Sequence, residues 1–255
     1  MVEYINVHKA FDAPVLTGVN LRVAPGETMS VVGHSGTGKS VLLKTTIGLI
    51  TPDFGNVRID GVSVFGSDRK TIGQIRKKAG YVFQNAALFD SMTVFENVST
   101  GLPEDQLKAM RFREVLKRVA EALEHVNLQP RAVLSKLPAE LSGGMRKRVG
   151  LARAIVGRPE ILLYDEPVTG LDPVNAAIVH QLIERLGREL GVTSIVVTHD
   201  IEGALPISDH VAMLDGGLIR FVGTPEEFRV SEDILVRAFL ERDAMTGSDS
   251  VLEAV

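Results

Sequence analysis

Several features are missing from this sequence, and each absence excludes a class of chemistry or location. There is no cysteine among the 255 residues, so disulfides, thiolate nucleophiles and cysteine-ligated zinc are impossible. No apolar run approaches the roughly 20 residues that a membrane-spanning helix needs. No secretory leader is evident, since Met1, Val2 and Glu3 are followed by mixed polar residues. If a membrane is involved, we expect another subunit to cross it.

A basic excess is also missing. The formal net charge is −4 at pH 7, whereas a protein that grips nucleic acid through its phosphates usually carries a clear surplus of Lys and Arg. Nucleic acid is therefore not expected as a partner. Hydrophobic residues make up 45% of the chain, which allows a sizeable core without disulfides or a structural metal.

The pattern of apolar residues predicts an α/β fold with a mainly helical middle. Strands are expected at 4–7, 19–23, 28–32, 161–164 and 194–197. Helices are expected at 40–50, 104–126 and 173–190. The second helix carries an apolar stripe of Leu107, Met110, Leu116, Val119 and Leu123. Hairpins are expected at Asp60-Gly61 and at Gly216-Gly217.

Near the carboxyl terminus, residues 233–240 form an amphipathic segment with Ile234, Leu235, Ala238 and Phe239 apolar. It packs either on its own domain or on a partner. Residues 246–255 are polar and short, and we expect a flexible tail there.

One segment has the spacing of a phosphate-binding loop. It consists of Gly33, His34, Ser35, Gly36, Thr37, Gly38, Lys39 and Ser40. Glycines let successive backbone N–H groups curl around a triphosphate, and the following helix adds a favourable dipole. We expect Lys39 to reach the β- and γ-phosphates and the Ser40 hydroxyl to ligate Mg²⁺. His34 occupies a variable position and is expected to do no chemistry.

Two expected strands end in polar residues that suit phosphate chemistry. Asp165 and Glu166 follow one strand, and His199 follows the other. Because α/β sheets bind ligands at the carboxyl ends of their strands, we expect Asp165 to hold Mg²⁺ and Glu166 to act as general base on the attacking water. His199 would contact the γ-phosphate. The alternatives are a plain turn for the two acids and a structural role for the histidine.

A second anion site is predicted at Leu141, Ser142, Gly143, Gly144 and Met145. Ser142 would cap a helix, and the two glycines would expose N–H donors.

These segments, in this order, resemble the nucleotide-binding domain of ABC machines, and the resemblance covers about residues 2–240. It implies an ABC-type P-loop ATPase over residues 1–245, with a RecA-like parallel-sheet core, an antiparallel β subdomain and an inserted helical subdomain at about 85–158. It implies ATP and Mg²⁺ as cofactors. It also implies a head-to-tail dimer, in which the signature (141–145) of one copy closes over ATP held by the phosphate loop of the other.

The resemblance assigns further roles. Gln84 looks like the Q-loop glutamine that senses Mg²⁺ and the membrane partner, so it is both a catalytic and a metal-binding candidate. Asp172 lies in a segment similar to the D-loop. Phe11 stands where the family places an aromatic that stacks on adenine, and we favour this role over the alternative that Phe11 belongs to the core. Tyr4 is a weaker candidate. Met145 and Gly170 depart from the commoner glutamine and alanine, and neither change removes a group that contacts phosphate.

Two stretches indicate which kind of ABC system the chain resembles. Residues 84–98 and 141–148 look like the corresponding parts of the ATPase subunits of Mla-type phospholipid transport systems. The implied partners are a membrane permease, an MCE-domain lipid-binding protein and a STAS-domain subunit, at the cytoplasmic face of the inner membrane. Within the first stretch, Leu88, Phe89, Met92 and Phe95 either bury themselves or form a groove for a coupling helix of the permease.

Other interpretations stay open. The chain could serve an ABC importer or exporter of another solute, such as an amino acid, or could be a soluble ABC protein acting on ribosomes or DNA. The basic runs 76–78 and 146–148 face either lipid headgroups, a partner or solvent.

Overall fold

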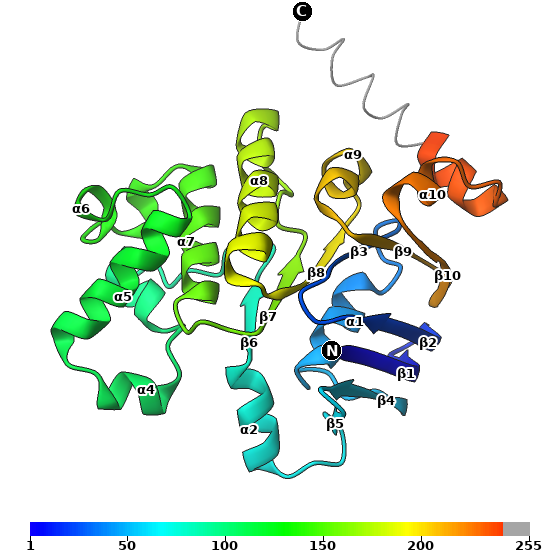
Figure 1. Cartoon of the computed structure of the whole chain (residues 1–255), viewed down its shortest axis with the longest axis horizontal. Helices are drawn as coiled ribbons and strands as arrows, with labels where there is room; N and C mark the ends of the chain where they lie inside the picture. Colours follow the sequence, from blue (N-terminus) through cyan, green and yellow to red (C-terminus); the bar gives the residue numbers. More distant parts are fainter. Residues whose placement is uncertain (242–255) are drawn as a thin grey trace, which may run out of the picture. The chain divides into compact units, whose positions relative to one another are not determined.

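The computed structural model describes residues 1–241, which form two compact units that we describe separately (Figure 1). Unit 1 contains Met1–Phe65 and the chain from Val196 onward, and unit 2 is Gly66–Ile195. The expected helical subdomain at about 85–158 falls within unit 2. The predicted flexible tail at 246–255 lies outside the described residues.

Unit 1 contains an antiparallel sheet built from the first part of the chain. Its strands are β1 (Val2–Ala10), β2 (Pro14–Val23), β4 (Phe54–Ile59) and β5 (Val62–Ser63), in the order β2-β1-β4-β5. The predicted hairpin at Asp60-Gly61 is confirmed. Both residues have left-handed φ angles, 51° and 79°, which suit a two-residue hairpin turn.

Unit 1 also contains β3 (Thr28–Val32), which pairs in parallel with β9 (His210–Asp215). Strand β9 pairs antiparallel with β10 (Leu218–Gly223), as the predicted hairpin at Gly216-Gly217 requires. All five residues of β3 are buried. The strand therefore gives the loop after it a rigid starting point.

Three further helices and a 3₁₀ turn complete the named elements of unit 1. They are α1 (Lys39–Thr46), α9 (Ile201–Ala204), η2 (Leu205–Ile207) and α10 (Pro225–Arg229). Helix α1 is shorter than the predicted 40–50. It ends at Thr46 because Gly48 adopts φ 66°, a left-handed conformation that terminates helices.

The segment after α10 packs on its own unit, which decides between the two alternatives for residues 233–240. Residues 234–241 are helical. Val236 is fully buried and Phe239 is 4% exposed, in a cluster that includes Phe228 and Val211. Ile234, by contrast, is 82% exposed. The buried face is therefore set by the three-residue spacing of Val236 and Phe239.

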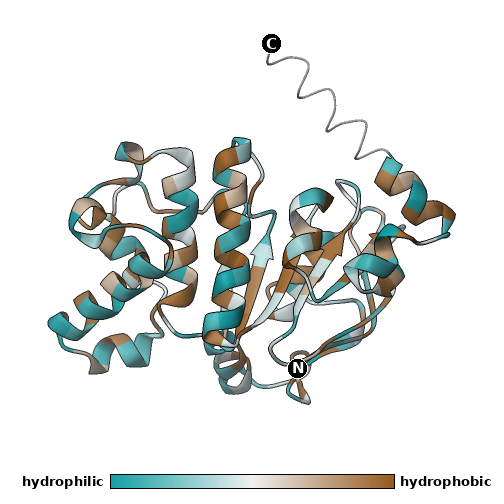
Figure 2. Ribbon diagram, turned by 45° about the horizontal axis from the view of Figure 1, so that its top comes forward, coloured by the Kyte–Doolittle hydropathy of each residue, from teal (hydrophilic) through white to brown (hydrophobic). Residues whose placement is uncertain are grey.

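Unit 2 is mainly helical. Its helices are α2 (Arg69–Lys77), α3 (Val94–Ser99), α4 (Glu104–Ala109), α5 (Phe112–His125), α6 (Pro130–Val133), α7 (Gly143–Ile155) and α8 (Pro173–Leu190), with a 3₁₀ turn η1 (Pro138–Glu140). Strands β6 (Ala79–Val82) and β7 (Ile161–Asp165) pair in parallel. Strand β8 (Thr193–Thr198) carries the chain across the division between the units. Brown and teal alternate along α8, as expected for an amphipathic helix (Figure 2).

The prediction of one helix over 104–126 is wrong. Met110 is extended (φ −86°, ψ 141°), and Arg111 starts a new helix whose first turn is capped by Glu114. The buried face of α5 consists of Val115, Val119, Ala122 and Leu123. The predicted stripe is therefore only partly correct, since Leu107 is 39% and Leu116 is 36% exposed.

Within residues 1–241, no helix combines the length and the apolar character that crossing a membrane would require. The predicted α/β class, with both parallel and antiparallel strands, is confirmed.

Candidate functional site

The phosphate loop of unit 1 joins β3 to α1 through glycines that other residues could not easily replace. Gly36 and Gly38 have φ angles of 82° and 100°, which are unfavourable for residues with a Cβ. A Cβ on Gly33 would lie 2.3 Å from the carbonyl oxygen of Leu214. A Cβ on Gly36 would meet nothing within 4 Å, so the loop is open at that point. An open backbone bent at glycines suits the N–H contacts to phosphate that the sequence predicts.

Lys39 is folded back over this loop. Its Nζ donates to the carbonyl oxygens of Gly33 (2.7 Å) and His34 (3.0 Å), and the residue is only 5% exposed. Thr37 Oγ1 also donates to the His34 carbonyl, at 2.8 Å. These two acceptors are neutral carbonyl oxygens, and phosphate oxygens would be stronger acceptors for the ammonium.

His34 uses its main chain and its ring for different contacts. Its carbonyl accepts from Lys39, and its exposed ring packs edge-to-face on Phe239, with 4.9 Å between ring centroids. The imidazole is therefore engaged by the carboxyl-terminal helical segment.

The aromatic candidates in unit 1 have opposite environments. Phe11 is 60% exposed, with Lys9 Nζ 5.3 Å from its ring centroid, so the alternative that it belongs to the core is wrong. Tyr4 is 2% exposed, and its hydroxyl lies 2.5 Å from Thr46 Oγ1. Burial also raises the pKa of the Tyr4 phenol. Tyr4 has no ring face available for a base.

His199 follows β8 in unit 1 and is exposed. The next residue, Asp200, accepts a hydrogen bond from the Gly203 backbone N–H at 3.0 Å and caps α9. The cap fixes the backbone immediately after His199.

In unit 2, the two acids at the end of β7 are almost completely buried. Asp165 is 5% and Glu166 is 8% exposed. The Tyr81 hydroxyl donates to Asp165 Oδ2 (2.8 Å), and Thr169 Oγ1 donates to Glu166 Oε2 (3.2 Å). Glu166 has φ 49°, a left-handed conformation that costs a non-glycine residue about 1–3 kcal/mol. Such strain is often found at functional sites.

Lys147, which the sequence placed in a basic run, is buried in unit 2. It is 7% exposed, and its Nζ donates to the carbonyl oxygen of Gln84 and lies 3.5 Å from that of Glu166. Desolvation lowers the pKa of Lys147, and the negative charge of Glu166 opposes this shift. The expectation that this run faces lipid, a partner or solvent is therefore wrong for Lys147.

The other basic side chains of the two runs have local partners. Arg146 donates to the Leu141 carbonyl (2.6 Å) and Arg148 to the Asn127 carbonyl (3.0 Å). Lys77 and Lys78 form exposed ion pairs with acidic side chains of unit 2, each at 2.9 Å.

The backbone after β6 is held in place from α7. Gln84 is exposed, and the following Ala86 and Ala87 have left-handed φ angles of 58° and 46°. Arg153, which is 9% exposed, donates to the carbonyls of Ala86 (2.5 Å) and Ala87 (2.6 Å). Sequence reasoning missed both Arg153 and Lys147. The burial of Lys147 could have been predicted, since Lys147 lies one helical turn before the apolar Leu151 and therefore on the same face of α7.

The signature opens α7 as predicted. Ser142 caps the helix by accepting from the Met145 N–H (3.2 Å), and Ser142 and Gly143 are exposed. A Cβ on Gly144 would lie 2.2 Å from Asn175 Oδ1. Asn175 in turn donates twice to Asp172, at 2.6 and 3.0 Å, and these hydrogen bonds lower the pKa of Asp172. One asparagine thus contacts both the signature glycine and the D-loop aspartate.

Among residues 1–241, no group of three or more acidic or histidine side chains forms a metal site by itself. The predicted ligands are a Ser40 hydroxyl in unit 1 and the Asp165 carboxylate and Gln84 amide in unit 2. All three offer the hard oxygen donors that Mg²⁺ prefers, and a sparse protein ligand set is typical of Mg²⁺ that binds together with nucleotide phosphates.

Unit 2 has a groove of about 530 Å³ along the segment after β6. Its walls include Phe83, Ala87, Phe89 and Arg153, and Phe89 is 53% exposed. The Arg153 guanidinium lies 5.8 Å from the Phe83 ring centroid. Phe89 is therefore available to a partner rather than buried.

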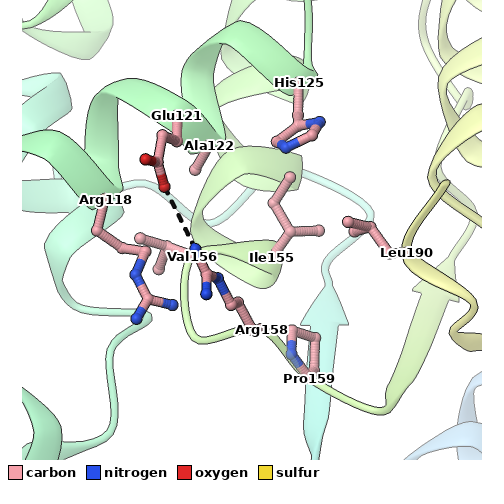
Figure 3. Close-up of a pocket in the computed structure, with 9 residues that line it drawn as sticks. All are labelled: Arg118, Glu121, Ala122, His125, Ile155, Val156, Arg158, Pro159 and Leu190. Atoms are coloured by element: carbon pink, nitrogen blue, oxygen red, sulfur yellow. Dashed lines mark hydrogen bonds and ion pairs between the residues drawn. The ribbon is translucent and has the colours of Figure 1, made fainter.

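A second cavity of unit 2, about 220 Å³ in volume, lies elsewhere, between α5 and the end of α7 (Figure 3). Ile155 and Val156 line it together with Arg118, and Glu121 pairs with Arg158 at 3.4 Å. None of the predicted site residues lines this cavity.

Known proteins resemble this chain over most of its length. The family described as "ABC transporter" matches residues 16–169. The methionine import ATP-binding protein MetN 2 of Pseudomonas syringae pv. tomato is 40% identical over 224 residues, which cover 86% of this chain and 66% of that protein. The chain therefore spans about two thirds of the length of this relative.

Two further matches are informative. The intermembrane phospholipid transport system ATP-binding protein MlaF of Haemophilus influenzae is 36% identical over 242 residues, covering 92% of this chain and 88% of MlaF. The dimeric post-hydrolysis structure of the ATP-binding cassette MJ0796, bound to ADP and Pi, has a TM-score of 0.80 at 35% identity and covers 88% of this chain and 99% of that one. The predicted cassette fold is confirmed. The Mla-type resemblance is only one of the relationships found, because methionine import proteins outnumber MlaF among the most similar relatives and reach 40% identity, against 36% for MlaF.

Proposed function

The chain belongs to the ABC transporter family as an ATP-binding cassette, a class that hydrolyses ATP to power transport, and from this premise we propose that it drives phospholipid transport between bacterial membranes. The observation that supports the ATPase part most directly is the glycine cradle of unit 1, with Lys39 folded over its carbonyls. The lipid part is supported by the resemblance of residues 84–98 and 141–148 to Mla-type subunits and by the similarity to MlaF.

In the proposed reaction, Lys39 and the N–H groups of the phosphate loop hold the β- and γ-phosphates. Ser40, Asp165 and Gln84 would hold Mg²⁺, which neutralises phosphate charge during the transfer. Glu166 accepts a proton from the attacking water, and Thr169 fixes its carboxylate orientation. His199 contacts the γ-phosphate, and Phe11 stacks on the adenine ring.

We further propose that two copies assemble head to tail. The proposal is supported by the exposed Ser142 and Gly143 at the amino terminus of α7, which offer N–H donors to an anion. The structural relative MJ0796 is described as a dimer. In this arrangement, one copy completes the nucleotide site of the other with four residues: Ser142, Gly143, Gly144 and Asp172.

The groove in unit 2 is the proposed docking place for a membrane permease. Its exposed Phe83 and Phe89 suit the apolar face of a short helix. Docking there would place the chain at the cytoplasmic face of the inner membrane. An MCE-domain protein and a STAS-domain subunit are the further proposed partners.

The ATPase proposal is tested with Glu166→Gln. We expect ATP binding to persist, because the phosphate loop is unchanged, and hydrolysis to fall about 100-fold to 10,000-fold, because a general base is lost. A nucleotide-bound dimer should accumulate and be visible by size-exclusion chromatography with multi-angle light scattering.

The matched control is Glu160→Gln, which removes a carboxylate just before β7 that pairs with Lys78 at the surface. It should hydrolyse ATP at the wild-type rate. Rapid hydrolysis by Glu166→Gln would refute the role assigned to Glu166.

The transported substrate is tested by purifying the tagged chain with its membrane partners from native membranes in mild detergent. Mass spectrometry should find a permease, an MCE-domain protein and bound phospholipid. The second candidate, amino-acid import, is favoured by the 40% identity to a methionine importer. A soluble solute-binding protein in place of the MCE protein would support that candidate and refute lipid transport.

A further inference from the structure

Helix α7 buries two cations that face main-chain carbonyls. Lys147 is 7% exposed and Arg153 is 9% exposed. Lys147 donates to the carbonyl oxygens of residues 84 and 166, and Arg153 donates to those of residues 86 and 87, so the acceptors are uncharged. Burying an ammonium group away from water is costly unless polar groups satisfy it. The arrangement therefore calls for an explanation beyond packing.

The two acceptors of Lys147 have different places in the sequence but related proposed roles. Gln84 follows β6, and Glu166 follows β7, the strand that pairs with β6. Gln84 is the proposed sensor and Glu166 the proposed general base. A single ammonium thus joins the backbones of both residues.

Glu166 needs such support because its backbone is strained. Its φ of 49° is left-handed, and a strained conformation persists only where surrounding contacts determine it. Its carbonyl oxygen lies 3.5 Å from Lys147 Nζ and 3.4 Å from the Thr169 backbone N. Because these contacts fix the carbonyl, they also fix the direction in which the Glu166 carboxylate leaves the chain.

We propose that Lys147 is a positioning residue that holds the Glu166 backbone in its left-handed conformation and ties it to Gln84. The inference rests on the proposed function, in which Glu166 is the general base. Lys147 itself contacts no reacting atom in this scheme. Its substitution should therefore slow the chemical step without weakening ATP binding.

The test compares Lys147→Met with Lys147→Gln in the full chain. Methionine fills the same space but donates no hydrogen bond, so kcat should fall about 10-fold to 100-fold, the effect of misplacing a catalytic group by about 1 Å. KM for ATP, and the Kd for a fluorescent ATP analogue, should stay within about twofold, since ATP binding by the phosphate loop is intact. Glutamine keeps an N–H donor and should recover most of the lost kcat.

Lys117→Met is the matched control. It removes an exposed lysine ammonium of α5, which pairs with Glu121 at 3.8 Å. It should leave kcat unchanged. Urea unfolding of every variant shows whether a loss of activity merely follows a loss of folded protein.

A double-mutant cycle with Glu166→Gln tests whether Lys147 acts on the rate through Glu166. In that background, Lys147→Met should not reduce the residual single-turnover rate further, because the group it positions is gone. An equal fall in both backgrounds, an unchanged kcat in Lys147→Met, or no recovery with glutamine would overturn the proposal. If Glu166→Gln hydrolyses ATP normally, the general-base assignment itself fails. If only Lys147→Met is normal, that assignment stands and the positioning role is wrong.

Discussion

The phosphate loop of unit 1 and the two segments that follow β6 and β7 in unit 2 all need left-handed backbone, and they obtain it differently. In the loop, glycine occupies the left-handed positions, with φ 82° at Gly36 and 100° at Gly38. In unit 2, the residues at such angles are Ala86, Ala87 and Glu166. Glycine tolerates these angles because it lacks a Cβ, whereas the other three residues are strained there.

The difference indicates how each region is stabilised. A glycine loop adopts its shape without help and can adjust around a ligand, at the cost of a larger loss of conformational entropy on folding. The strained residues of unit 2 need partners, and α7 supplies them through Lys147 and Arg153. We therefore expect the function of the loop to depend on the side chains that would contact phosphate. The segments after β6 and β7 should instead depend on the side chains of α7 that hold their carbonyls.

Among the substitutions that test this comparison, Lys39→Met should have the largest effect, because it removes the ammonium held over the loop carbonyls of Gly33 and His34. Because a charge that stabilises transferring phosphate contributes about 100-fold to 1000-fold, ATP hydrolysis should fall by that amount. Steady-state ATPase assays measure it. Lys44→Met, later in the same helix, is the control and should keep its activity. Full activity in Lys39→Met would show that the glycine loop does not serve nucleotide.

A smaller effect is expected from Phe11→Ala. Because base–aromatic stacking contributes about 1–3 kcal/mol, KM for ATP should rise roughly 5-fold to 150-fold while kcat changes little. The free energy of unfolding should hardly change, since Phe11 is 60% exposed. Phe112→Ala provides the comparison, because Phe112 is 69% exposed and lies in unit 2. Equal KM values for the two variants would show that Phe11 does not stack on the nucleotide.

The smallest effect is expected from Ala87→Gly, which relieves a left-handed alanine (φ 46°) at an exposed position. The free energy of unfolding should rise by about 0.5–1 kcal/mol. Ala177→Gly, at an exposed position inside α8, should lower it by about 0.5–1 kcal/mol, since glycine weakens helix interiors. Urea unfolding measures both. The same sign in both variants would mean that Ala87 is not strained.

The elements that could be predicted from the sequence were those with strong local signals. Helix α8 has the predicted bounds, because Pro173 favours its first turn and Gly191 adopts the left-handed conformation that ends it. Both hairpins were predicted from dipeptides suited to left-handed turns. The break at Met110 was missed, because the apolar stripe continues across it while the burial does not.

Exposure of single side chains was the least predictable property. Tyr4 and Phe11 were both candidates for base stacking, and only the tertiary structure shows that Tyr4, in β1, is buried and that Phe11, just after β1, is exposed. Lys147 was expected in a basic run facing lipid, a partner or solvent. Its burial depends on carbonyls that come from two distant segments of the chain.

By itself, the sequence determined the order and identity of the chemical groups: the glycine loop with Lys39, the capped signature helix, and the acids after a buried strand. These follow from spacing along the chain, because glycine, caps and apolar runs act within a few residues. Only the tertiary structure decided which cations are buried and which backbone they support. A hydrogen bond from Lys147 to Gln84 and Glu166 exists only when β6, β7 and α7 pack together, and no local pattern encodes that packing.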